Sequence, residues 1–360
     1  MKKAIIAMSG GVDSSVAALL TRQAGDECIG VTMQLYHNED VGIGRQKTCC
    51  SLDDVEDARA VCRRLGMRFY VFNFTDCFKE AVIGRFVDAY RRGHTPNPCI
   101  DCNCYLKFGK LLQRMRELQM DYVATGHYAR VAYDEGAGRY LLKKGLDETK
   151  DQSYVLYMLT QEQLAHIRFP LGELTKEEVR RIARENGFIN AGKRDSQDIC
   201  FVPDGDYAKV IEAVTGEVSR PGEFVDRTGK VLGRHEGIIH YTIGQRRGLR
   251  LAAGERVYVT DISPEDNRVV LGRNEDLFHS ELTADQVNLI SCDRLEETVR
   301  VTAKIRYRHR EQPATAWQTA EGRLHIRFDE PQRAVTKGQA VVLYDGDNVV
   351  GGGVICGVER

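Results

Sequence analysis

Short apolar runs alternate with segments of helical periodicity over residues 1–205. In residues 52–65, for example, apolar side chains recur at the three- and four-residue spacing of a helix. This alternation is typical of a parallel α/β sheet whose strands are joined by helices. The pattern predicts strands at 4–8, 28–33, 68–74 and 122–125, and helices at 14–23, 52–65, 78–90 and 105–118.

The pattern changes to short strands after residue 205. Residues 223–232 predict a hairpin with its turn at Thr228-Gly229, and further short strands are expected at 257–259 and 269–271. From Val299 onward the chain is almost entirely strand-like, which predicts a small barrel or sandwich. The expected strands there are 299–308, 314–319, 323–328 and 340–344. We therefore expect three domains, at residues 1–205, 206–280 and 281–360.

Composition narrows the class of protein only a little. The chain has 360 residues and a formal net charge of −1, so RNA binding would require a local basic surface. The apolar run at 4–8 is too short for a signal peptide, and no run approaches the roughly 20 apolar residues of a membrane span. The 11 cysteines are odd in number, which favours a reducing, cytoplasmic location in which some thiols do chemistry.

A turn rich in glycine and hydroxyl groups separates the first predicted strand from the first predicted helix. Its sequence is Ser9-Gly10-Gly11-Val12-Asp13-Ser14-Ser15. Glycine permits a tight turn, and the N–H groups at a helix start suit pyrophosphate. Asp13 could organise the turn or help to hold a metal ion. The turn lacks both the lysine of the usual P-loop and the spaced glycines of the dinucleotide fingerprint; a turn without a ligand is the weaker alternative.

Two distant cysteines form a second candidate site. Cys102 follows the proline-stiffened segment 95–98 close to a predicted helix start, where a thiol tends toward thiolate. Cys200 follows the polar segment 195–198. Three interpretations are open. The cysteines are ordinary small residues without chemistry, they belong to a zinc site that uses the Cys99–Cys102 spacing, or two of them are thiols that transfer sulfur. A second cysteine pair of comparable spacing is missing, which weakens the zinc interpretation.

Motifs along essentially the whole chain resemble those of the tRNA-specific 2-thiouridylase family, within the PP-loop ATP pyrophosphatases. They are Ser-Gly-Gly-Val-Asp-Ser at 9–14, Pro-Asn-Pro-x-x-x-Cys-Asn at 96–103, and the segments 124–130, 150–154, 196–201 and 241–248. The resemblance implies an α/β fold class. The implied architecture is an N-terminal PP-loop (adenine nucleotide alpha hydrolase-like) domain, a small mixed central tRNA-binding domain and a C-terminal β-barrel. The resemblance also implies an activity, the ATP-dependent 2-thiolation of the wobble uridine in tRNA.

The same resemblance implies the roles of individual residues. ATP, with Mg²⁺, would contact Ala7, Met8, Ser9, Gly10, Gly11, Val12, Asp13, Ser14, Met33 and Gly126. tRNA would contact Asn97, Pro98, Cys99, Lys150, Asp151, Gln152, Arg306 and Tyr307. Catalysis would use Asp13, a persulfide on Cys200 and a resolving thiol on Cys102, with a transient disulfide between the two cysteines. A cysteine desulfurase or sulfur-relay protein would supply the sulfur.

Cys99 departs from a common family pattern, in which this position is Asp. Cys49, Cys50 and Cys104 also make the N-terminal half rich in thiols. In the simpler hypothesis, which we prefer, Cys99 does not react. In the alternative, Cys99 joins Cys102 and Cys200 as ligands of an iron–sulfur cluster.

Four basic residues alternate at 304, 306, 308 and 310, so a strand would place them all on one face. That face could follow RNA phosphates, and Tyr307 could stack on a base; a solvated barrel exterior is the alternative. Two other functions stay open on the residues alone. One is a different PP-loop enzyme, such as an amidating synthetase, and the other is a catalytically silent protein that binds tRNA or a metal.

Overall fold

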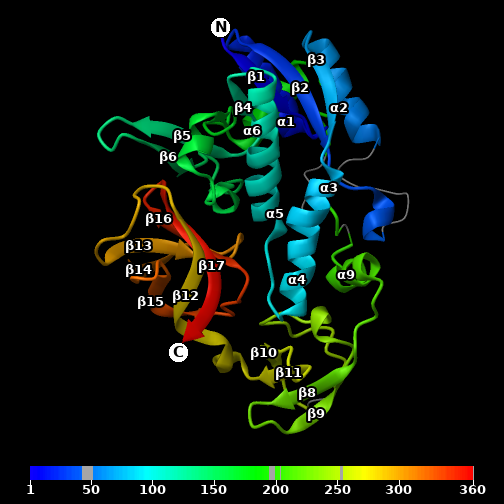
Figure 1. The fold of residues 1–360 in the computed structure, drawn as a ribbon, viewed down its shortest axis with the longest axis vertical. Coiled ribbons are helices and arrows are strands. Elements are labelled where there is room, and N and C mark those ends of the chain that lie inside the picture. The colour runs from blue at the N-terminus through cyan, green and yellow to red at the C-terminus, as the bar shows by residue number, and fades with distance from the viewer. Residues whose placement is uncertain (43–51, 194–198, 203, 252–253, 360) are drawn as a thin grey trace.

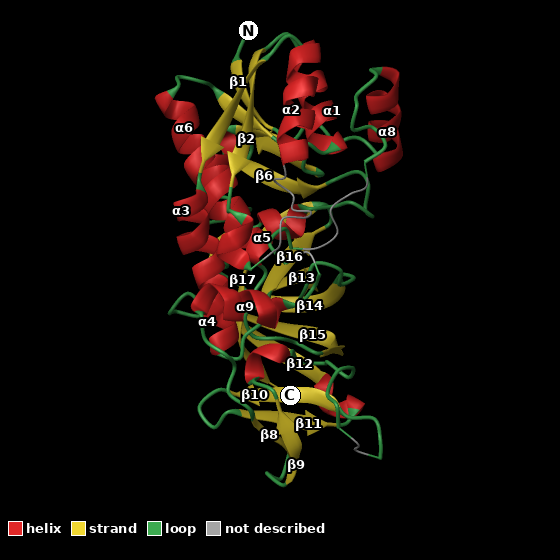
Figure 2. Ribbon diagram, turned by 90° about the vertical axis from the view of Figure 1, so that its right-hand side faces the viewer, coloured by secondary structure: helices red, strands yellow, loops and turns green. Residues whose placement is uncertain are grey.

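The computed structural model describes residues 1–42, 52–193, 199–202, 204–251 and 254–359. Along the longest axis, a parallel sheet with its helices lies at one end of the molecule (Figure 1). A small mixed sheet within residues 222–272 lies at the other end. Between them, a β-barrel lies beside long helical segments (Figures 1 and 2).

Five parallel strands form the N-terminal sheet. Their order is β3 (Arg68–Asn73), β2 (Glu27–Gln34), β1 (Lys3–Ala7), β4 (Tyr122–Ala124) and β7 (Ile167–Arg168). The predicted parallel α/β arrangement and its four predicted strands are confirmed; β7 was not predicted. Two residues are too few to produce a readable period, so β7 owes its conformation to pairing with β4.

Apolar cores cover both faces of this sheet. Successive residues of a strand point to opposite faces, so Ile5 and Ile6 of β1 belong to different cores. Ile5 packs with α6 (Leu111–Glu117), and Ile6 packs with α1 (Val12–Gln23), α2 (Leu52–Arg64) and α8 (Lys176–Glu185). Burial on both faces explains why β1 is apolar throughout after Lys3.

Two long helical runs extend from the sheet toward the other domains. The first joins α3 (Thr75–Phe78), the π-helix η2 (Lys79–Gly84) and α4 (Arg85–Arg91). The second joins α5 (Pro98–Asp101), the π-helix η3 (Cys102–Lys110) and α6. Both predicted helices are confirmed and are longer than predicted. π-helical turns are rare and are frequently found at functional sites, and η3 begins at Cys102.

The central domain is a mixed four-stranded sheet next to one helix. The helix is α9 (Tyr207–Thr215). The strands, in the order β10-β11-β8-β9, are β10 (Tyr258–Ser263), β11 (Arg268–Gly272), β8 (Gly222–Asp226) and β9 (Val231–His235). The predicted β8–β9 hairpin is confirmed, and Gly229 adopts the positive φ of 88° that its turn requires.

Six strands close the C-terminal barrel. They are β12 (Phe278–Leu289), β15 (Leu324–Arg333), β14 (Gln312–Gln318), β13 (Val299–Lys304), β16 (Ala340–Asp345) and β17 (Asn348–Glu359), and β17 pairs back onto β12. The predicted barrel is confirmed. The prediction of a strand over 299–308 is wrong, because β13 ends at Lys304 and residues 305–310 form a turning connection.

A hairpin from the N-terminal region extends the barrel sheet. It consists of β5 (Ala129–Asp134) and β6 (Arg139–Lys144), and Lys143 of β6 pairs with Asn348 of β17. The remaining elements are η1 (Asn38–Val41), η4 (Ser153–Leu156), α7 (Gln161–Ala165), η5 (Ile238–His240) and η6 (Asn274–Leu277). Among the described residues, no helix is both long and apolar enough to cross a membrane.

Candidate active site

The glycine-rich turn lies where β1 meets α1, at the carboxyl edge of the parallel sheet. Gly11 is the N-cap of α1 and provides no capping side chain. Hydroxyl groups hold the turn instead: Ser14 Oγ accepts from Ser9 N at 3.2 Å and donates to Gly11 O at 3.0 Å, and Ser9 Oγ accepts from Gly11 N at 3.4 Å. A helix start that lacks a capping side chain suits an anion, because its N–H groups and dipole favour negative charge.

Two glycines are required by close contacts around this turn. Gly10 has a φ of +75°, and a Cβ there would lie 2.3 Å from the carbonyl oxygen of Asp54. A Cβ on Gly126 would lie 2.7 Å from the carbonyl carbon of Asp13 and 2.8 Å from Ser14 N. Gly126 therefore lets the end of β4 approach the start of α1, which joins two segments predicted to bind ATP.

Asp13 lies in a network that the sequence did not predict. Lys176 Nζ donates to both carboxylate oxygens of Asp13, at 2.7 and 2.8 Å, and Tyr128 OH donates to one of them at 2.8 Å. Lys176 is only 8% exposed and begins α8, where Thr175 and Glu178 form a capping box. The capping box was readable in the sequence, but its proximity to Asp13 was not.

The other residues predicted to bind ATP lie in or next to the first two strands. Ala7, Met8 and Val12 are buried, and Met8 O accepts from Thr32 Oγ1 at 2.8 Å. Met33 is the penultimate residue of β2 and packs against two of the apolar cores. The structure thus gathers the predicted ATP residues at one edge of the sheet.

A buried histidine follows Gly126. His127 Nδ1 lies 2.6 Å from Thr125 Oγ1, and the imidazole packs edge-on against Phe169 and beside Phe108. Burial, aided by the charge of Lys107, lowers the pKa of His127 well below its usual value. Burial therefore favours the neutral ring, in which one nitrogen donates a hydrogen bond and the other accepts one.

Cys102 and Cys200 border the same apolar core. Cys102 is buried at the start of η3. Cys200 is half-buried in a turn, and Tyr36 OH donates a hydrogen bond to the Cys200 carbonyl oxygen at 2.6 Å. Both cysteines belong to a cluster that includes Phe78 and Phe201. The structure therefore places the two predicted sulfur-transfer residues at one apolar core, although 98 positions separate them in the sequence.

The expectation that the Cys102 thiol tends toward thiolate is wrong for this structure. Burial, with a smaller contribution from Asp101, raises the pKa of Cys102 against the opposing effect of Lys107. Burial also raises the pKa of Asp101 to about 6, although Arg85 Nε lies 3.2 Å from its carboxylate. The helix start contributes less than the cost of placing a charge in an apolar core.

The residues do not converge as an iron–sulfur site in this structure. Cys99 is exposed, Cys102 is buried and Cys200 is half-buried. In the described parts of the chain, no group of three or more His, Cys, Asp or Glu side chains is placed to hold a metal ion. Cys49, Cys50 and the polar residues 195–198 lie outside the described residues.

The segment before Cys102 is attached to the barrel. Asn97 caps α5 by accepting from Cys99 N at 3.2 Å, and Pro98 occupies the first helical position. Lys337 O accepts from Thr95 N at 2.9 Å, and Gln339 Nε2 donates to Thr95 O at 2.8 Å. The barrel therefore positions residues 95–99, a contact that sequence patterns did not indicate.

Tyr307 lies where three of the predicted tRNA-binding segments meet. Its ring centroid lies 6.1 Å from that of Tyr154. Burial raises the pKa of Tyr307, and the charges of Asp151 and Cys99 add to this effect. Segments 97–99 and 150–152 therefore lie close enough to Tyr307 for their charges to act on its hydroxyl group, and 39% of the Tyr307 surface is exposed.

The predicted face of four basic residues is not present. Lys304 ends β13 and is largely buried, with a side-chain exposure of 15%. Arg306 is half-buried and donates to the carbonyl groups of Arg333 and Ala334, at 3.2 and 3.4 Å. Arg308 and Arg310 are exposed. Lys304 and Arg306 therefore make internal contacts, and only the other two arginines are open to a ligand along this connection.

The predicted segment 150–152 contains one buried acid between two less buried residues. Asp151 Oδ1 accepts from Gly145 N and Ser153 N, both at 3.1 Å. Gln152 Oε1 accepts from Tyr128 N at 3.1 Å, which connects this segment to the tyrosine that binds Asp13.

Comparison with known proteins agrees with this architecture. Residues 2–204 match the tRNA methyl transferase HUP domain, residues 210–273 the tRNA methyl transferase PRC-barrel domain, and residues 279–355 the aminomethyltransferase β-barrel domain. Among solved structures, the U34-tRNA thiolase NcsA of Methanococcus maripaludis is 19% identical and covers 60% of this chain and 70% of its own. Its TM-score of 0.34 is too low to inform the chemistry.

Curated relatives match almost the full chain. The tRNA-specific 2-thiouridylase MnmA of Clostridioides difficile is 54% identical over 354 residues, or 98% of each chain. MnmA 2 of Caldanaerobacter subterraneus is 54% identical over 98% of this chain and 97% of its own. MnmA of Acetivibrio thermocellus is 52% identical over 98% of this chain and 99% of its own. The chain belongs to the tRNA-specific 2-thiouridylase family.

Proposed function

We propose that this protein thiolates C2 of the wobble uridine in tRNA, using ATP to activate the C2 oxygen and a cysteine persulfide to deliver sulfur. The observation that carries the proposal is the presence of two chemistries in one domain. A hydroxyl-rich turn with a buried lysine suits pyrophosphate, and two cysteines border one apolar core nearby in the fold. An amidating enzyme of the PP-loop class has no need of the cysteine pair.

ATP activation uses the edge of the sheet that ends in the glycine-rich turn. The N-terminus of α1, the serine hydroxyls and Lys176 would bind the phosphates. Mg²⁺ would accompany ATP and offset the charge of the departing pyrophosphate. Met33 and Gly126 lie at the same edge, where the adenosine would be held. Attack of the uridine C2 oxygen on the α-phosphorus then yields adenylated uridine and pyrophosphate.

Sulfur transfer uses the two thiols in sequence. A sulfur donor, such as a cysteine desulfurase or a sulfur-relay protein, would load Cys200 as a persulfide. The terminal sulfur attacks C2 and AMP leaves, so that uridine and Cys200 are joined through a disulfide bond. Cys102 then attacks the Cys200 sulfur, which breaks this bond, releases 2-thiouridine and forms a Cys102–Cys200 disulfide. A thiol reductant must restore both thiols before the next cycle.

The buried state of Cys102 fits this order of events. A thiol with a raised pKa is a poor nucleophile, so Cys102 would stay unreactive until the target base enters and rearranges its surroundings. The target base must leave its stack so that its C2 atom can reach the cysteines and the activated phosphate. Tyr307 and the residues at 97–99 and 150–152 lie where they could receive it.

Incubation of unmodified tRNA with the protein, MgATP, a cysteine desulfurase with cysteine as the sulfur source, and a thiol reductant tests the proposal. Mass spectrometry of the digested nucleosides should detect 2-thiouridine, and the reaction should release AMP and pyrophosphate only when tRNA is present. Pyrophosphate release without 2-thiouridine would contradict sulfur transfer. The Cys200→Ser variant serves as the matched control, because it should retain pyrophosphate release and lose thiolation.

A further inference from the structure

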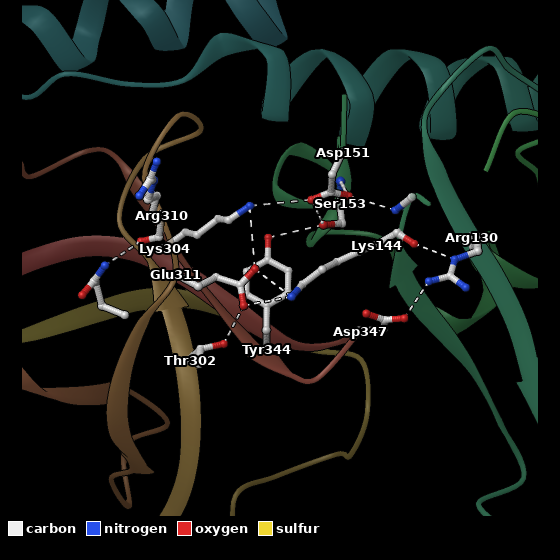
Figure 3. A network of polar contacts seen from close by, with 12 residues as sticks. Arg130, Lys144, Asp151, Ser153, Thr302, Lys304, Arg310, Glu311, Tyr344 and Asp347 are labelled. Atoms are coloured by element: carbon white, nitrogen blue, oxygen red, sulfur yellow. Dashed lines mark hydrogen bonds and ion pairs between the residues drawn. The ribbon is translucent and has the colours of Figure 1, made fainter. Parts of the chain in front are cut away.

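Four charged residues mark the ends of two loops, one from each side of the contact between the N-terminal region and the barrel (Figure 3). Lys144 and Asp151 flank residues 145–150, and Lys304 and Glu311 flank residues 305–310. Lys144 Nζ lies 2.7 Å from Glu311 Oε1, and Lys304 Nζ lies 3.7 Å from Asp151 Oδ2. Each lysine thus pairs with the acid of the other loop, and the two pairs cross between the loops.

The network is sealed from water on most sides. The side chain of Asp151 is only 4% exposed, and those of Lys304, Lys144 and Glu311 are 15%, 18% and 22% exposed. Both lysines lie over the ring of fully buried Tyr344, at 4.9 and 5.4 Å from its centroid. Buried charges of this kind are costly to separate, because removal of one partner leaves the other unpaired.

Further hydrogen bonds fix the two acids. Thr302 Oγ1 donates to Glu311 Oε2 at 2.7 Å. Ser153 Oγ donates to Asp151 Oδ2 at 2.8 Å and lies 3.4 Å from Tyr344 OH. The network therefore fixes both ends of each loop.

We propose that these crossed ion pairs position a two-loop platform for tRNA, and that Asp151 positions this platform without touching RNA. The inference rests on the proposed function. The loop 145–150 contains Lys150, and the loop 305–310 contains Tyr307 and the exposed Arg308. Asp151 is buried and already accepts three hydrogen bonds, so it has little remaining capacity for a ligand.

The placement of Lys304 supports the same role. It is the last residue of β13, and its Nζ also lies 3.9 Å from Glu311 Oε1. A lysine that contacts phosphate is expected to be open to solvent, whereas Lys304 is enclosed by two carboxylates and an aromatic ring. The charge of Lys304 is therefore used within the protein.

Measurements of tRNA affinity over a range of salt concentrations test this inference. Loss of a phosphate contact lowers the slope of log Kd against log salt by about one, whereas loss of a positioning residue weakens binding at every salt concentration and leaves the slope unchanged. The full-length variants Lys304→Met, Asp151→Asn and their combination are compared with Lys150→Met. Arg300→Met, which breaks an exposed ion pair with Asp329 on the same barrel, is the control.

We expect Lys304→Met and Asp151→Asn each to weaken tRNA binding about tenfold, a size typical of coupling between sites, with an unchanged salt slope. The combined variant should lose no more than either single variant, because the pair acts as a unit. ATP affinity and the Arg300→Met variant should remain at wild-type values. If Lys304→Met does not fold, Glu311→Gln provides the same comparison, because glutamine can still accept from Thr302.

Two results would overturn the inference. One is wild-type tRNA affinity in both single variants, and the other is a salt slope that falls by about one in Lys304→Met. A wild-type protein that binds no tRNA would instead overturn the proposed function. Wild-type binding together with unaffected network variants would overturn only the crossed-pair inference.

Discussion

Lys176 Nζ binds both carboxylate oxygens of Asp13, at 2.7 and 2.8 Å, although 163 positions separate the two residues in the chain. Lys176 is the first residue of α8, so it reaches the glycine-rich turn from a different segment of the chain. Asp13 holds the lysine beside the α1 N-terminus, so a phosphate group that arrives there would meet a preorientated positive charge.

Substitution of Lys176 by Met should therefore impair ATP activation. Hydrogen bonds to charged groups contribute about 1.5–3 kcal/mol, so kcat/KM for ATP in tRNA-dependent pyrophosphate release should fall roughly 10- to 100-fold. Steady-state assays with varied ATP would measure the loss. Arg181→Met, which alters an exposed pair on the same helix, should behave as wild type; equal activity of the two variants would remove Lys176 from the ATP site.

The variants Asp13→Ala and Ser14→Ala should lose thiolation because ATP activation is weakened. Asp13→Ala releases Lys176, and Ser14→Ala removes the hydroxyl that bonds to Ser9 N and Gly11 O. Pyrophosphate release in the presence of tRNA should fall at least tenfold in each variant, a loss equivalent to about 1.4 kcal/mol. Unchanged release in both would contradict the assignment of the turn.

Local patterns were sufficient to predict the glycine-rich turn, because strand, turn and helix follow one another within residues 3–23. The contact between Lys176 and Asp13 could not be predicted, because it depends on how α8 packs beside α1. The strands β12 and β17 were missed for a related reason. Their side chains meet several partners and follow no simple alternation, and closure of the barrel determines their length.

The basic residues after Val299 show the opposite error. Lys304, Arg306, Arg308 and Arg310 alternate as a strand face would, but β13 ends at the first of them. Hydrogen bonds from Arg306 to two barrel carbonyl groups stabilise a turn at this point, and such contacts override a two-residue period. The alternation of basic residues therefore did not predict where the strand ends or which of the four side chains are exposed.

This geometry separates the effects of two charge reversals. Arg308 is exposed, so Arg308→Glu should weaken tRNA binding and lower its salt dependence while leaving the thermal midpoint unchanged. Arg306→Glu should in addition lower the thermal midpoint by several degrees, because it removes two hydrogen bonds from a half-buried site. Binding titrations and thermal unfolding test both expectations. If Arg308→Glu binds tRNA with wild-type affinity, residues 305–310 are a solvated surface that does not contact tRNA.

Asp101 should make stability depend on pH. Burial raises its pKa to about 6, above the usual 3.8, so the folded state binds more protons than the unfolded state between those values. The free energy of unfolding contributed by this group therefore falls as pH rises from about 4 to 6 and is constant above that range. Asp101→Asn should gain about 1–3 kcal/mol relative to wild type across this interval.

Thermal midpoints of wild type and Asp101→Asn at pH 4.5, 5.5, 6.5 and 7.5 would measure this difference. Asp329→Asn is the control, because the hydrogen bonds from Arg300 lower the pKa of Asp329 and the group is exposed. A difference between Asp101→Asn and wild type that is constant over this pH range would contradict a raised pKa in the folded protein.

Cys99 distinguishes the two hypotheses for the cysteines. It is exposed at the first turn of α5, whereas Cys102 is buried in an apolar core against which the half-buried Cys200 also packs. The persulfide route requires only Cys102 and Cys200, and those two cysteines could not form a disulfide while they held a cluster.

Under strictly anaerobic purification, Cys99→Ser should therefore retain most of the thiolation activity, and the wild type should contain no stoichiometric iron. Cys102→Ser and Cys200→Ser should each lose thiolation while retaining pyrophosphate release, because adenylation of the C2 oxygen precedes the steps that use the thiols. Nucleoside mass spectrometry, iron analysis and pyrophosphate assays measure the three outcomes. Loss of both activity and bound iron in Cys99→Ser would refute the persulfide–disulfide route and favour a cluster held by Cys99, Cys102 and Cys200.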